Sequence, residues 1–186
     1  SQMVDSATTF NQWLSIYRKL ISWEIELSQS SDNSIQEVLQ YQKNEANVAF
    51  CRFVRQNYQG WINSRDEETP VMSHTLMRSK ILPVVDANSK TTLLLIDNFR
   101  YDQWREISSM LRGYYDVDVD DLYCAILPTA TQYARNAIFS GLSPLQIQEM
   151  YPNLWIDEDE EESKKNNEEA LIQTLLDRYR KRYDYT

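Results

Sequence analysis

The first 59 residues of this 186-residue chain contain neither glycine nor proline. Those two residue types punctuate turns, so their absence favours long helices over short strands joined by tight turns. From 10 to 27, apolar side chains recur at intervals of three and four residues, which is the pattern of one helical face. The sequence therefore predicts an amphipathic helix over this range.

A second helix is predicted between the polar break at 28–33 and Gly60. Ser34 and Glu37 have the spacing of a capping box at its start, and Gly60 is the expected end. Two such helices joined by a short polar loop form an antiparallel hairpin, which needs a further helix or a partner chain to cover its apolar faces. Two interpretations are open: a spacer without chemistry, or a dimerisation surface.

The pattern changes after the hairpin. Short apolar runs at 91–97 and 122–127 read as buried strands, and a helical pattern at 101–111 lies between them. Strand, helix and strand in this order predict a parallel βαβ unit. We therefore expect an α/β protein with a helical bundle or hairpin over 1–85 and part of a parallel sheet domain over 86–186.

Charge and cysteine content exclude several classes of function. The formal net charge of −9 comes largely from the acidic run at 157–162, which we expect to be a solvated loop, so nonspecific binding to nucleic acid is not expected. The chain has neither a membrane-length apolar stretch nor a signal peptide, which predicts a soluble, cytoplasmic protein. Cys51 and Cys124 are expected to be buried thiols, and His74, the single histidine, a hydrogen-bonding or capping group.

Asp97 and Thr131 are the candidate reactive residues. Asp97 ends one predicted strand and Thr131 follows the other by four residues, and the carboxyl ends of parallel strands gather at one edge of a sheet. Thr131 also stands where a helix begins, and backbone N–H groups at such an end favour a phosphate. A threonine hydroxyl needs a metal or a base to react, so a metal held partly by Asp97 is consistent with both residues. Alternatively, both residues cap the helices that follow them.

Two long segments resemble a known family. Residues 94–104 (LLIDNFRYDQW) and 126–142 (ILPTATQYARNAIFSGL) resemble the PglZ domain of PorX-type response regulators, which belongs to the alkaline phosphatase superfamily. The helical region, including 42–48 (QKNEANV), resembles the same group. The resemblance implies that 86–186 is a partial alkaline-phosphatase-like domain, that Asp97 is a metal ligand, and that Thr131 is the metal-bound nucleophile.

The nucleotide pyrophosphatase branch of that superfamily has the pattern P-T-x-T-x-P-N-H-x-S-x-x-T-G. This chain keeps four of its positions, namely Pro128, Thr129, Thr131 and Gly141. Ala134 and Arg135 stand where the pattern has Asn and His, so Arg135 and Asn136 are the candidate substrate-binding replacements. Thr129 is a second candidate nucleophile, but the spacing to Gly141 favours Thr131.

The resemblance implies a two-component response regulator whose output domain is a zinc-dependent phosphodiesterase acting on oligonucleotides or cyclic nucleotides, with a role in type IX secretion. The implied partners are a receiver domain preceding residue 1, a cognate histidine kinase, secretion or transcription proteins, and a second copy bound through the helical region, without membrane insertion. Two zinc ions are expected, with their remaining ligands after residue 186, so we expect this excerpt to be inactive.

Two other functions stay open. The fold could serve as a non-catalytic signalling and protein-interaction module. Alternatively, Asp97 could be the nucleophile of a phosphohydrolase, although the chain lacks the second Asp two residues later that such enzymes use.

Overall fold

The computed structural model describes residues 2–28, 33–64, 69–88, 90–155 and 167–183. The chain divides into two compact units, each made of two stretches of sequence. Unit 1 comprises Ser1–Trp61 and Leu94–Leu122, and unit 2 comprises Ile62–Leu93 and Tyr123–Thr186. The predicted domain boundary between residues 85 and 86 stays a prediction.

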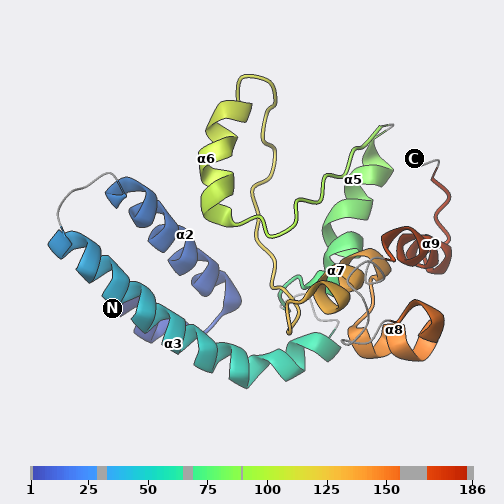
Figure 1. Ribbon diagram of the computed structural model, residues 1–186, viewed down its shortest axis with the longest axis horizontal. Coiled ribbons are helices and arrows are strands. Elements are labelled where there is room, and N and C mark those ends of the chain that lie inside the picture. Colours follow the sequence, from blue (N-terminus) through green and yellow to red (C-terminus); the bar gives the residue numbers. More distant parts are fainter. Residues whose placement is uncertain (1, 29–32, 65–68, 89, 156–166, 184–186) are drawn as a thin grey trace. The chain divides into compact units, whose positions relative to one another are not determined.

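The predicted helical hairpin is confirmed in unit 1, where α2 (Phe10–Leu27) and α3 (Asn33–Asn63) lie side by side (Figure 1). A short helix, α1 (Gln2–Ser6), precedes them, and Thr9 and Gln12 form a capping box at the start of α2. The predicted helix end at Gly60 was wrong, because α3 runs on to Asn63. Trp61 packs against Phe10 and Phe53, which gives the last turn of α3 a tertiary contact.

Aromatic side chains form the core of unit 1. Trp13 and Ile16 of α2 and Ala46 of α3 are buried, and Phe50 and Phe53 pack against them. The Trp13 ring lies 5.3 Å from the Phe50 ring and 5.9 Å from the Phe53 ring, measured between centroids. Such pairs contribute beyond their burial, which stabilises the hairpin.

The segment 94–122 packs on α2 through a mixed aromatic and charged contact. Its helix, α6 (Tyr101–Leu111), places Tyr101 with its ring centroid 6.0 Å from that of Tyr17. Arg18 lies over the Tyr101 ring at 5.7 Å and donates a 2.7 Å hydrogen bond to the Asp120 carbonyl. One arginine therefore connects α2 to both ends of this segment.

Unit 2 is a cluster of short helices around α7 (Thr131–Ser140). On one side, α4 (Ser73–Leu76), a π-helix (Met77–Ile81) and α5 (Leu82–Ala87) follow one another without a break. The remaining elements are α8 (Pro144–Met150), a 3₁₀ turn (Pro152–Leu154) and α9 (Glu168–Arg178). The helical spacing of Leu171, Ile172, Leu175, Leu176 and Tyr179 in the sequence predicts a last amphipathic helix, and α9 confirms it.

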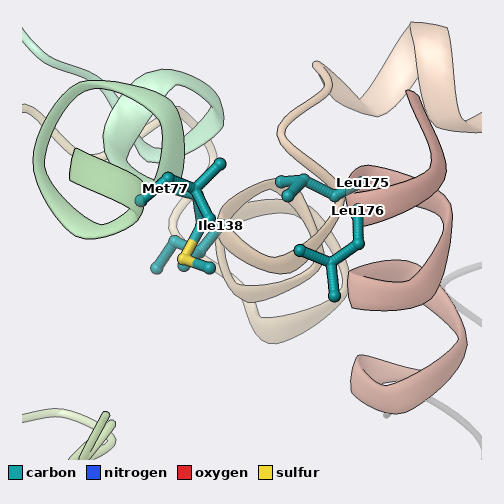
Figure 2. Close-up of a cluster of buried hydrophobic side chains, with 5 residues drawn as sticks. Met77, Ile138, Leu175 and Leu176 are labelled. Carbon is teal, nitrogen blue, oxygen red and sulfur yellow. The ribbon is translucent and has the colours of Figure 1, made fainter. Parts of the chain in front are cut away.

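Part of the core of unit 2 lies around α7. Figure 2 shows Ile138 of α7 with Met77 from the π-helix and with Leu175 and Leu176 from α9. All four side chains are buried. Burying aliphatic side chains of this size stabilises by roughly 1.5–3 kcal/mol each.

The predicted parallel sheet is wrong. In the described ranges, the sole β pairing is an isolated parallel bridge between Met72 and Cys124. The predicted strand at 91–97 is an exposed, irregular segment, with Leu94 80 % accessible. A strand is stable when a neighbour completes its hydrogen-bond ladder, and a short apolar run does not specify that neighbour.

Gly141 allows α9 to approach the end of α7. Its φ of +65° is left-handed, and its N–H bonds the Ala137 carbonyl at 3.0 Å, which ends the helix. A Cβ at this position would lie 2.7 Å from Leu175 Cδ1. Glycine therefore serves both the backbone conformation and the close helix contact.

Gly141→Ala is expected to destabilise unit 2 by about 1–3 kcal/mol, because it combines left-handed strain with a clash against a packed leucine. Chemical denaturation measured by circular dichroism tests this. Gly60→Ala is the matched control: a Cβ at Gly60, inside α3, meets nothing within 4 Å, so the change should stabilise by about 0.5–1 kcal/mol. Equal effects of the two changes would contradict the role given to Gly141.

Candidate functional site

Thr131 is the first residue of α7, and Ala130 is the N-cap. The Ala130 carbonyl accepts hydrogen bonds from the N–H groups of Tyr133 at 3.0 Å and Ala134 at 2.9 Å, so the first turn is well formed. The Thr131 side chain is half-buried, and 128–130 is exposed. The candidate nucleophile therefore lies beside the positive end of a ten-residue helix, next to an accessible approach.

The chain that leads into α7 is held by two hydrogen bonds to the start of α4. The Cys124 N–H donates to the Val71 carbonyl at 2.8 Å, and the Ile126 N–H donates to Ser73 Oγ at 3.0 Å. Ser73 and Ile126 are fully buried. These bonds fix the path of the segment that ends at Thr131.

Ser73→Ala is expected to cost about 1–3 kcal/mol of stability, because it leaves the buried Ile126 N–H without its acceptor. Ser79→Ala, at an exposed position of the adjoining π-helix, is the control and should change stability by less than about 0.5 kcal/mol. Thermal unfolding of the two variants measures the difference, and an unchanged midpoint for Ser73→Ala would refute this role.

Arg135 and Thr131 are four residues apart on α7 and so lie on the same helical face. Arg135 Nε lies 2.8 Å from Glu168 Oε1 at the start of α9, and each side chain is about three-quarters buried. Asn136, 3 % exposed, faces the interior of the unit. Sequence reasoning missed Glu168 and Ser73, since both act through contacts with residues distant in sequence.

Asp97 belongs to unit 1, whereas Thr131, Arg135 and Asn136 belong to unit 2. Asp97 is exposed in a turn, followed by Asn98 with a left-handed φ of +53°. The N-cap of α6 is Arg100, whose guanidinium pairs with Asp102 and lowers the pKa of that carboxyl. Asp97 and Thr131 therefore do not occupy the N-cap positions of α6 and α7.

The described residues do not provide a metal centre. Within them, no group of three or more His, Cys, Asp or Glu side chains could hold a metal ion. The His74 side chain is half-buried in α4, and burial lowers its pKa, so it is neutral at pH 7. The predicted acidic loop at 157–162 lies outside the described residues.

The two cysteines differ in environment, and both are free thiols. Cys51 is exposed on α3, so its predicted burial was wrong. Cys124 is partly buried, and burial raises the pKa of its thiol to about 11.

Iodoacetamide at pH 8 is expected to alkylate Cys51 at least about tenfold faster than Cys124, because the thiolate is the reactive form and Cys124 holds its proton up to a pKa of about 11. The preference should narrow as the pH approaches that value. Peptide mass spectrometry after timed quenching measures both rates, with Cys51→Ser and Cys124→Ser to assign the signals. Equal rates at pH 8 would contradict the burial of Cys124.

Comparison with known families accounts for both halves of the chain. Residues 76–185, which include α7 and Thr131, match the BREX system PglZ alkaline phosphatase-like domain. The chain belongs to the PglZ alkaline phosphatase-like family. Residues 1–62 match the PorX response regulator linker domain. The resemblance to PorX-type response regulators is thereby confirmed, and the two matches together indicate a PorX-like response regulator with an alkaline phosphatase-like domain.

A search of curated proteins returned no match for this PglZ-family chain. In the part of the chain that the structure describes, no helix combines the length and apolar character needed to cross a membrane.

Proposed function

We propose that this chain is part of a response regulator whose PglZ-type output domain cleaves phosphodiester bonds in oligonucleotides or cyclic nucleotides, with Thr131 as the nucleophile. The observation that carries the proposal is the position of Thr131 at the start of α7, within the matched PglZ region. Oγ1 would lose its proton and bond to phosphorus as the alcohol oxygen leaves and takes up a proton, and water would then release the phosphate from Thr131. The helix end would favour the developing negative charge.

Arg135 supports the assignment of a phosphate substrate. It lies on the Thr131 face of α7, and its contact with Glu168 limits the positions that the guanidinium can take. Guanidinium groups bind phosphate oxygens through paired N–H donors. Arg135 is therefore the proposed substrate-binding residue, and the second candidate, Asn136, is buried beside it in α7.

The proposal includes zinc, because a threonine hydroxyl is a weak nucleophile at neutral pH and needs to be activated. Asp97 and Thr131 are the residues proposed to contact it. These two residues do not make a complete site, because the described residues contain no group of three or more His, Cys, Asp or Glu side chains that could hold a metal ion.

The direct test is hydrolysis of a fluorescent dinucleotide by the full-length protein with added zinc. Thr131→Val keeps the shape of the side chain and removes the hydroxyl, so the rate should fall at least about a hundredfold. Thr129→Val, at the exposed position two residues earlier, should leave the rate within about threefold of wild type. Equal rates for wild type and Thr131→Val would refute the nucleophile, and a loss confined to Thr129→Val would transfer the role to Thr129.

The second candidate is a non-catalytic signalling module that binds secretion or transcription proteins in response to a receiver domain and its histidine kinase. The observation in its favour is that, within the described residues, no group of three or more His, Cys, Asp or Glu side chains could hold a metal ion. Wild-type protein with no zinc-dependent hydrolysis of any phosphodiester would favour this function, in type IX secretion or elsewhere.

A further inference from the structure

An ion pair between two helices of unit 2 lies beside the proposed phosphate site. Arg135 Nε of α7 and Glu168 Oε1 at the start of α9 are 2.8 Å apart, and both atoms are buried from solvent. Thr131 is four residues before Arg135 on α7, a spacing that places two side chains next to each other on one helical face. A phosphate bound between Thr131 and Arg135 would therefore lie close to a carboxylate.

The burial of this contact makes the charge of Glu168 important for an anion nearby. Water screens the charges of an exposed salt bridge, whereas the buried Nε and Oε1 atoms interact through a less polar medium. At the phosphate site the positive charge of Arg135 is then largely cancelled by the negative charge of Glu168. Arg135 would offer hydrogen-bond donors to a phosphate but little net positive charge.

Phosphate esters differ in charge, and a neutralised arginine distinguishes them. A phosphodiester carries one negative charge at neutral pH, because it has no second acidic proton. A phosphomonoester carries nearly two, because its second pKa is about 6. The second charge gains little from a neutralised guanidinium, is repelled by the carboxylate, and raises the cost of removing the ligand from water.

We infer that Glu168 is a specificity-determining residue, which cancels the charge of Arg135 and makes the site prefer a monoanionic phosphodiester over a dianionic phosphomonoester. The inference rests on the proposed function, because it takes Thr131 and Arg135 as the phosphate site. It also bears on product release. Hydrolysis of a diester yields an alcohol and a monoester, and the monoester would be held less tightly than the substrate.

Binding of two small esters to the chain itself, without added metal, tests the charge preference. Methyl phenyl phosphate is a monoanionic diester, and phenyl phosphate, which lacks the methyl group, is a dianionic monoester at pH 8. NMR titration of wild type should give a Kd for the diester at least about fivefold lower than for the monoester. Glu168→Gln keeps an oxygen acceptor for Arg135 and removes the charge, so the preference should reverse. Glu169→Gln, at the exposed next position of α9, is the matched control and should keep the wild-type ratio.

The pH dependence of wild-type binding is a second test, which needs no substitution. Between pH 5 and pH 8 phenyl phosphate gains a negative charge, so its Kd should rise at least about fivefold. The charge of methyl phenyl phosphate does not change, so its Kd reports any titration of the protein and should stay within about twofold. Circular dichroism shows whether Glu168→Gln folds, and if it does not, the pH series decides.

The outcomes separate this inference from the nucleophile assignment. Equal ratios for wild type and Glu168→Gln, or a monoester that binds as tightly at pH 8 as at pH 5, would overturn the role of Glu168 and leave Thr131 untouched. Equal hydrolysis by wild type and Thr131→Val would refute the nucleophile without changing either binding ratio. A chain that binds neither ester would overturn the phosphate site and this inference together.

Discussion

The packing of α9 against the end of α7 is the contact on which the rest of unit 2 depends. Gly141 makes the approach possible, because it ends α7 with a left-handed φ and presents hydrogen in place of a side chain to Leu175. Arg178 of α9 then connects the two helices by donating to the Ser140 carbonyl at the end of α7, and it also donates to Tyr151 Oη after α8 and to Thr174 Oγ1 within α9. One small residue and one long cation thus hold α7 in place.

The chemistry available at the site follows from the placement of α7. With its far end held by α9, α7 presents Thr131 at its start, while Ser73 and Val71 fix the chain that enters it. The same helix places Arg135 beside Glu168, so a carboxylate from α9 holds a guanidinium on the helical face that carries Thr131. The proposed phosphate binding rests on these placements: a hydroxyl at a helix end and a guanidinium on the same helical face.

The helices were predictable to different degrees. The helical spacing of the apolar residues in α2, α6 and α9 predicts helices there, and those helices form as expected. The end of α3 was not predictable, since Trp61 extends the helix through contacts with Phe10 and Phe53. The predicted strands failed for the opposite reason: their apolar residues have no ladder partner in the described ranges apart from the bridge at Cys124.

The sequence by itself determined the helical hairpin and the family, and it singled out Thr131 and Gly141 as motif positions. These conclusions depend on local periodicity and on motif spacing. Only the tertiary structure decided that Glu168 pairs with Arg135, that Ser73 supports Ile126, and that Asp97 and Thr131 fall in separate compact units. The physical reason is the distance in sequence between the residues that interact. Helix periodicity is encoded over a few neighbouring residues, whereas these contacts join residues distant in sequence and form when whole elements pack.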